Sequence, residues 1–482
     1  MGQLTNILAK TVKELEDRGR EQAGKDPYRL RFHLMPPVGW LNDPNGLCQY
    51  RGDYHVFFQY SPSDCQGGLK LWGHYRSPDL LRWEYLGAPL LADTPWDCHG
   101  VYSGSALAEG DGLHLYYTGN IKLEDRDYDY IQEGREAWTL HTVSRDGVIF
   151  GSKRVALSPR HYPAHYTCHI RDPKVWREGD CLHMIQGGRR RDEKGAVLLY
   201  SSRDGETWEF DRELTTREPF GYMWECPDLF SLGDRQVLAF SPQGLTREEY
   251  RYQNVYQSGY FLLEKDWREE QTFENFREWD YGFDFYAPQT FQDDRGRRIL
   301  VGWMGVPDSQ EEYTNPLEGG WQHALTVPRE VTLEEGRVLQ NPVEELEDLR
   351  GEQHPLSRGQ ELQLETPSFD LLLKREGQEK DFKLTLAGTE GGCTLTYREG
   401  AFRLELDQAA GRGRRLRQAR VEGLRELRIL ADTSALEIYL NGGETVFTTR
   451  WYPGQENLRR LLLETEAEGC LWEMDSMIVQ DI

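Results

Sequence analysis

Apolar residues in the first 330 positions gather in short, β-favouring runs, and a glycine turn precedes each run. The unit of turn and run occurs five times, and successive glycines lie 58, 69, 54 and 63 residues apart. Repeated strand clusters with almost no helical spacing predict a five-bladed β-propeller, with a large irregular β-sandwich as the alternative. The five turn glycines are Gly52, Gly110, Gly179, Gly233 and Gly296.

A second pattern, S-x-D-x-x-x-W-E, recurs among the strands. It spans residues 77–84 and 202–209, and Ser144-Arg-Asp-Gly is a weaker third copy. We assign it to the architecture of the blades rather than to catalysis, because it recurs with the strands.

The two ends of the chain differ from the repeats. Helical spacing of Leu4, Ile7, Leu8, Val12 and Leu15 predicts an amphipathic helix over residues 1–28. The propeller is expected over residues 29–335, and an acidic stretch predicts a helical linker over 336–352. Strict alternation in stretches such as 382–386 and 436–440 predicts half-buried antiparallel strands, and therefore a β-sandwich over 353–482. The expected fold class is all-β.

The composition of the chain limits the kinds of partner, compartment and cofactor that we expect for it. A net charge of −24 argues against nucleic acid but permits a small anionic substrate in a local basic pocket. The first residues lack a secretory pattern and no run is long enough to span a membrane, so we expect a cytoplasmic protein. Eight scattered cysteines predict neither disulfides nor zinc, and we expect no metal and no cofactor. A homo-oligomer stays open.

Unusual residue clusters lie 7 to 10 positions before the repeat glycines. Because equivalent positions of successive blades surround one axis, we expect Asp43, Asp172 and Glu225 to converge, although they lie up to 182 residues apart. Glycoside hydrolysis needs one carboxylate at the anomeric centre and one protonated acid at the leaving oxygen. The clusters span residues 40–46, 102–105, 171–173, 224–228 and 283–289.

Each candidate also has a structural interpretation. Asp43 lies in Asn-Asp-Pro-Asn-Gly, which is typical of a hairpin turn, and Arg171 and Asp172 could form an ion pair. Glu225 stands between Trp224 and Cys226, and such an apolar setting favours the protonated carboxyl of a general acid. The histidines His33, His55 and His114 are expected to pack in the core.

Residues 33–46, 171–173 and 224–228 resemble the three signature blocks of glycoside hydrolase family 32, in the order of that family. Residues 72–74, 102–105, 283–289, 323–330 and 432–442 extend the likeness to the end of the chain. The resemblance implies a β-fructofuranosidase with a five-bladed propeller and a β-sandwich. It implies Asp43 as nucleophile, Asp172 as transition-state stabiliser and Glu225 as acid/base, and a retaining pair lies ~5–5.5 Å apart.

The resemblance also implies the substrate. Intracellular bacterial members hydrolyse sucrose 6-phosphate, so sucrose or its 6-phosphate is expected. A fructan exohydrolase or fructosyltransferase is the alternative, and a catalytically dead sugar-binding propeller is a third hypothesis. Ser61 and Gln186-Gly-Gly-Arg189 depart from the family pattern, and Lys70, Arg189 and Arg190 are candidates either for phosphate binding or for a solvated surface. The implied sugar contacts are Trp40, Asn42, Gln59, Trp72, Tyr102, Ser103, Arg171, Tyr286 and Trp303.

Overall fold

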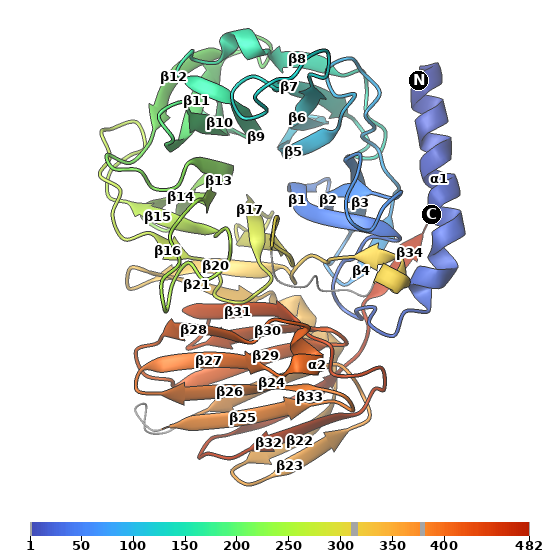
Figure 1. Cartoon of the computed structure of the whole chain (residues 1–482), viewed down its shortest axis with the longest axis vertical. Coiled ribbons are helices and arrows are strands. Elements are labelled where there is room, and N and C mark those ends of the chain that lie inside the picture. The colour runs from blue at the N-terminus through green and yellow to red at the C-terminus, as the bar shows by residue number, and fades with distance from the viewer. Residues whose placement is uncertain (1, 310–316, 376–380, 482) are drawn as a thin grey trace.

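The computed structural model describes residues 2–309, 317–375 and 381–481. Five sheets surround a central axis, and two six-stranded sheets pack as a sandwich below them in Figure 1. The predicted all-β class, a five-bladed propeller followed by a β-sandwich, is therefore confirmed.

Each blade is a four-stranded antiparallel sheet. Blade 1 has β1 (Gly39–Tyr50), β2 (Asp53–Ser61), β3 (Leu71–Ser77) and β4 (Arg82–Tyr85). Blade 2 has β5 (Val101–Glu109), β6 (Gly112–Lys122), β7 (Arg135–Ser144) and β8 (Arg154–Leu157). Blade 3 follows the 3₁₀ turn η1 (Pro159–His161) and has β9 (Tyr166–Glu178), β10 (Cys181–Arg190), β11 (Gly195–Ser202) and β12 (Glu209–Leu214). Blade 4 has β13 (Met223–Leu232), β14 (Arg235–Gln243), β15 (Gly259–Leu263) and β16 (Arg277–Glu278). Blade 5 has β17 (Tyr286–Gln292), β18 (Arg298–Trp303), β20 (Arg329–Glu334) and β21 (Arg337–Pro342). The segment between β18 and β20 contains the 3₁₀ turn η2 (Leu317–Gly319) and the short strand β19 (Trp321–Gln322), and β19 pairs with β1 of blade 1.

The sandwich contains every alternating stretch that the sequence singled out. One sheet has β22 (Arg350–Ser357), β24 (Phe369–Lys374), β29 (Glu426–Asp432), β30 (Ala435–Leu440), β31 (Thr445–Arg450) and β33 (Glu468–Met474). The other has β23 (Glu361–Leu364), β25 (Phe382–Ala387), β26 (Gly392–Arg398), β27 (Ala401–Leu406), β28 (Leu416–Arg420) and β32 (Arg459–Leu463), with the short helix α2 (Gln408–Gly411) beside them.

The five repeat glycines form the turns between the first and second strands of the blades. All five have φ between 58° and 89°, a region that glycine adopts without a steric penalty. The S-x-D pattern forms the turn after the third strand, where the Ser side chain contacts the Asp carboxylate, as Ser77 contacts Asp79 at 3.3 Å. Both repeats are therefore architectural.

The first strand of each blade bulges where its motif lies. Pairing with the second strand slips between residues 41 and 44, 101 and 104, 225 and 228, and 286 and 289, and blade 3 slips opposite Asp172. Three residues just before a proline have positive φ: Asp172 at 63°, Cys226 at 46° and Ala287 at 46°. Bulges turn side chains out of the regular alternation, so these five segments can aim side chains at the axis.

The N-terminal helix α1 (Gln3–Gly24) lies along the propeller (Figure 1). Its Glu16 carboxylate accepts hydrogen bonds from Tyr60 at 3.0 Å and from Tyr85 at 2.7 Å. The predicted apolar face is only partly correct, because Leu4 is 51% exposed while Val12 is buried. Among the described helices, none combines the length and the apolar character needed to cross a bilayer.

Three predicted boundaries differ in the structure. The propeller extends past residue 335, because Gly336 turns the chain into β21, the fourth strand of blade 5. The predicted helical linker is only the 3₁₀ segment η3 (Glu344–Leu349). The last strand, β34 (Ile478–Asp481), leaves the sandwich and pairs in parallel with β4 of blade 1.

A buried ionic cluster joins the propeller to the sandwich. His33 lies 2.8 Å from Asp432 and 2.9 Å from Glu437, and Arg329 lies 2.6 Å from Glu437 and 3.3 Å from Asp280. Because both imidazole nitrogens face carboxylates, these hydrogen bonds raise the pKa of His33 against the opposing effect of burial. The prediction that His33 packs in the core is confirmed by its burial, but its two carboxylate partners were not foreseen.

Candidate active site

A cavity of about 580 Å³ opens among the five blades, and the three predicted carboxylates lie in it together. Asp43 comes from β1, Asp172 from β9 and Glu225 from β13. Three separate bulges thus bring together groups that lie far apart in the sequence. The predicted contacts that also line the cavity are Trp40, Asn42, Gln59, Tyr102, Ser103, Arg171, Tyr286 and Trp303.

Neutral donors hold both oxygens of Asp43. Ser103 Oγ donates to Oδ2 at 2.5 Å, and Asn42 Nδ2 donates to Oδ1 at 3.1 Å. Gln59 fixes both donors, since its amide donates to Ser103 at 2.5 Å and accepts from Asn42 at 3.0 Å. Burial raises the pKa of Asp43, and the Ser103 and Asn42 hydrogen bonds oppose the rise. No ion pair of Asp43 occurs among the described residues, so neutral donors fix its carboxylate in position.

Asp172 lies beside Asp43, and Cys226 of blade 4 contacts both carboxylates. The Cys226 N–H donates to Asp172 Oδ2 at 2.9 Å, and the Cys226 thiol lies 3.6 Å from Asp172 and 3.7 Å from Asp43. Burial raises the pKa of Asp172, and the positive charge of Arg171 opposes this effect. The positive φ of Asp172 and Cys226 is what allows this approach.

Glu225 accepts hydrogen bonds at both oxygens. Arg171 donates to Oε1 through Nε at 3.0 Å and also through Nη2. Tyr286 donates to Oε2 at 2.6 Å and Gln243 at 2.8 Å. The expected apolar setting for Glu225 is wrong, because a guanidinium, a phenol and an amide surround its carboxyl group.

Comparison with known proteins identifies the family. The N-terminal domain of glycosyl hydrolases family 32 matches residues 33–342, and its C-terminal domain matches residues 339–470. The chain is 40% identical to sucrose-6-phosphate hydrolase of Bacillus subtilis, over 92% of this chain and 93% of that protein. The chain belongs to glycosyl hydrolase family 32.

Two solved structures of family 32 resemble it along nearly the whole chain. Sucrose-6-phosphate hydrolase from Lactobacillus gasseri has a TM-score of 0.86 at 28% identity, with 97% of both chains covered. A β-fructofuranosidase from Bombyx mori, solved in complex with sucrose, has a TM-score of 0.84 at 31% identity, with 97% of this chain and 99% of that chain covered.

One predicted sugar contact of this family 32 chain does not reach the cavity. Trp72 is fully buried on β3, two strands out from the axis, and its Nε1 donates to the Tyr102 carbonyl at 3.1 Å. It therefore supports Tyr102 from behind. The departures at Ser61 and Gln186 also lie outside the cavity: Ser61 holds its own loop through the Gly67 carbonyl at 3.1 Å, and Gln186 donates to Thr139 at 2.6 Å.

Several lining residues were not foreseen. His169 could have been found, because it lies two positions before Arg171 on β9 and alternate strand residues share a face. Tyr130 comes from the connection between β6 and β7, which carries no motif, and Arg135 is the first residue of β7. The unforeseen lining residues are Gln66, Tyr130, Ile131, Arg135, His169, Tyr222, Gln243, Tyr256, Pro307 and Asp308.

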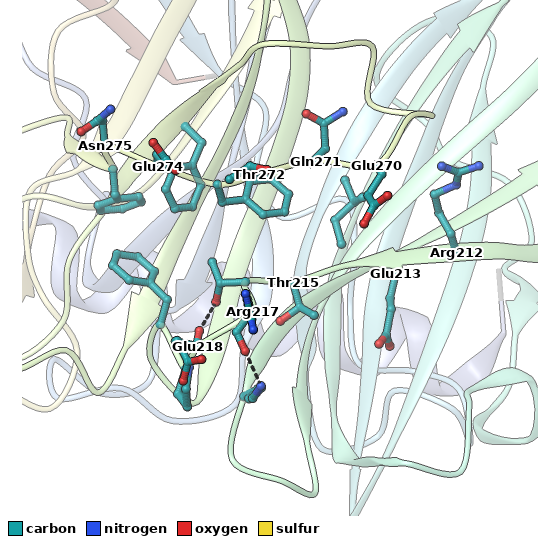
Figure 2. Close-up of a pocket in the computed structure, with 18 of the residues that line it drawn as sticks. Arg212, Glu213, Thr215, Arg217, Glu218, Glu270, Gln271, Thr272, Glu274 and Asn275 are labelled. Atoms are coloured by element: carbon teal, nitrogen blue, oxygen red, sulfur yellow. Dashed lines mark hydrogen bonds between the residues drawn. The ribbon is translucent and has the colours of Figure 1, made fainter.

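A larger open cavity of about 1170 Å³ lies on the flank of blades 3 and 4. Figure 2 shows Thr215, Arg217 and Glu218 on one wall and Gln271 and Glu274 on the other. No residue of the five sequence motifs lines this flank cavity, whereas all three carboxylates line the axial cavity. The smaller axial cavity is therefore the candidate active site.

Proposed function

We propose that this protein hydrolyses the β-fructofuranosyl bond of sucrose or sucrose 6-phosphate with retention of configuration. The observation that carries the proposal is that Asp43 and Glu225 share one cavity but have different partners, neutral donors for Asp43 and a guanidinium for Glu225. A pair of carboxyl groups with separate roles is the requirement of a retaining glycosidase. The names of the family relatives, sucrose-6-phosphate hydrolase and β-fructofuranosidase, support the same substrates.

In the proposed first step, a carboxylate oxygen of Asp43 attacks the anomeric carbon of fructose. The bond to the glycosidic oxygen breaks as Glu225 gives that oxygen its proton, and a fructosyl ester of Asp43 forms. The donors Ser103 and Asn42 favour this chemistry, because they orient the nucleophile without cancelling its charge.

In the proposed second step, water attacks the fructosyl ester. Glu225 takes a proton from that water, and Asp43 leaves as a carboxylate. Arg171, Tyr286 and Gln243 support this role, because their hydrogen bonds hold both oxygens of Glu225 in place. Asp172 is proposed to hold fructose hydroxyls, and its raised pKa suits a carboxyl that can also donate a hydrogen bond.

We also propose that the enzyme works in the cytoplasm. All eight cysteines are free thiols, including the exposed Cys98, which fits a reducing compartment. A phosphorylated disaccharide is charged and therefore does not cross a membrane readily. A phosphorylated substrate is thus consistent with an enzyme in the cytoplasm.

The test is the turnover of sucrose, sucrose 6-phosphate and inulin by the purified protein. We expect fructose release from the two disaccharides, with a much lower kcat/KM for inulin. A kcat/KM that is highest for inulin would favour a fructan exohydrolase instead. No fructose release from any of the three would contradict the proposal and would favour a sugar-binding propeller.

A further inference from the structure

The cavity has a cationic wall that the proposed hydrolysis does not explain. Arg135 begins β7, Arg171 and His169 lie on β9, and Arg189 lies on β10. Arg171 pairs with Glu225, and its Nη1 lies 3.2 Å from His169 Nδ1. The wall therefore starts at the acid/base, where the departing sugar must lie if Glu225 protonates its oxygen.

Arg135 has no acidic partner. Its guanidinium lies over the Tyr130 ring, 4.2 Å from the centroid, and Nη2 donates to the Tyr130 hydroxyl. Its Nε is buried without a hydrogen-bond partner, and no carboxylate of the described chain lies within ion-pairing distance of it. An arginine held on an aromatic face without a counter-charge is suited to an anion from outside the protein.

Arg189, which also lines the cavity, has a similar arrangement. Its guanidinium lies 4.3 Å from the centre of the Tyr222 ring, and its side chain is 13% exposed. It pairs with Glu193 in its own hairpin, but its Nε is also buried without a partner. Two arginines are thus held by tyrosines in the mouth of one cavity.

Positive charge is in excess at this wall. Burial, together with the guanidinium groups of Arg171, Arg135 and Arg189, lowers the pKa of His169 to about 2. The pKa of Arg135 is itself lowered, first by burial and then by repulsion from Arg171. Unpaired charges in a partly buried site are costly, so an anionic ligand would relieve the repulsion.

We propose that Arg135, with Arg189, determines specificity by binding a phosphate group on the departing sugar. Phosphate oxygens match the forked donors of arginine, and a neutral disaccharide would leave Arg135 without a counter-charge. A 6-phosphorylated disaccharide is then the preferred substrate. This inference rests on the proposed function, since it assumes that Glu225 faces the departing sugar.

Two other candidate cations fit the role less well. Lys70 lies 4.7 Å from the centre of the Trp40 ring on blade 1, near Asp43 and Asp64, and burial lowers its pKa to about 7. It is therefore only partly charged at neutral pH. Arg190 lies outside the cavity and is paired with Asp192 at 3.0 Å and also with Glu213.

The test compares kcat/KM for sucrose 6-phosphate and for sucrose in the wild type, Arg135→Gln, Arg189→Gln and Arg135→Lys. Arg190→Gln is the matched control, because it removes a neighbouring guanidinium outside the cavity. We expect the ratio of the two kcat/KM values to fall at least about tenfold in Arg135→Gln, as charge-assisted hydrogen bonds are lost. Arg189→Gln should lower the ratio, Arg135→Lys should restore part of it, and Arg190→Gln should leave it unchanged.

Inhibition by the two products gives a second readout that does not depend on turnover of the phosphorylated substrate. Glucose 6-phosphate should inhibit the wild type more strongly than glucose, and Arg135→Gln should remove most of that difference. A ratio that is unchanged in Arg135→Gln, or a wild type without preference for the phosphorylated substrate, would overturn the inference. The proposed function fails separately, if the wild type releases fructose from neither disaccharide.

Discussion

At the residue scale, the two carboxyls of the proposed retaining pair differ in the charge of their partners. Asp43 receives hydrogen bonds from Ser103 and Asn42, which are neutral, whereas Glu225 receives two from Arg171. Neutral donors fix a nucleophile while leaving it its charge, and the donors around Glu225 hold both of its oxygens in a defined orientation. The division of roles therefore follows from the surroundings rather than from the carboxyl groups themselves.

Only some residues of the cavity could be predicted from the sequence. Asp43, Asp172 and Glu225 were predictable, because each lies 7 to 9 residues before a repeat glycine and therefore on the innermost strand. Trp72 was misassigned, because it lies on a third strand and too far from the axis. Arg135 could not be predicted, because its place in the cavity depends on how the connection between β6 and β7 folds over blade 3.

At the element scale, the bulged inner strands connect the fold to the chemistry. The hairpin glycines were predictable, since glycine favours positive φ. The bulges were not predictable, because residues that seldom adopt positive φ do so there, including Asp172, Cys226 and Ala287. Such backbone strain persists only where surrounding packing fixes it, and it concentrates at functional sites.

Replacing Ala287 by glycine tests this strain. The left-handed conformation of an alanine costs about 1 kcal/mol, and its relief opposes two losses: about 0.8 kcal/mol for one buried methyl group and about 0.7 kcal/mol for the greater backbone entropy of glycine in the unfolded chain. We expect Ala287→Gly to lower the free energy of unfolding by about 0.5 kcal/mol, whereas glycine at Ala239, in the regular strand β14, should cost about 1.5 kcal/mol. Denaturant titration measures both. Equal losses in the two variants would show that Ala287 is not strained.

At the scale of the whole molecule, the ionic cluster around His33 holds the two domains together. The His33 pKa is raised, so its contribution to stability is complete below its ordinary value and is lost as pH rises through the folded value. The pKa of Glu437 is lowered to about 2, so its contribution is complete above its ordinary value and is lost as pH falls through about 2. Both contributions are therefore present together in mildly acidic solution.

Replacing His33 by leucine should destabilise the protein in a pH-dependent way. The variant leaves Asp432 buried without its cation, which costs about 3–5 kcal/mol near neutral pH, whereas Glu437 keeps Arg329 at 2.6 Å. The cost should shrink towards about pH 4, where Asp432 can take up a proton instead. The matched control is His55→Leu, because His55 is buried but its pKa is lowered to about 4 and it is neutral. A His33→Leu cost that did not vary with pH would contradict this account.

The most direct measurement of the central claim is to trap the covalent intermediate. Glu225→Ala, given a fructosyl donor whose leaving group needs no proton, should form the ester quickly and hydrolyse it slowly. Mass spectrometry of the digested protein should then find one fructosyl group on the peptide that contains Asp43. A fructosyl group on Asp172, or turnover without any adduct and with inversion of configuration, would contradict the assignment of Asp43 as nucleophile.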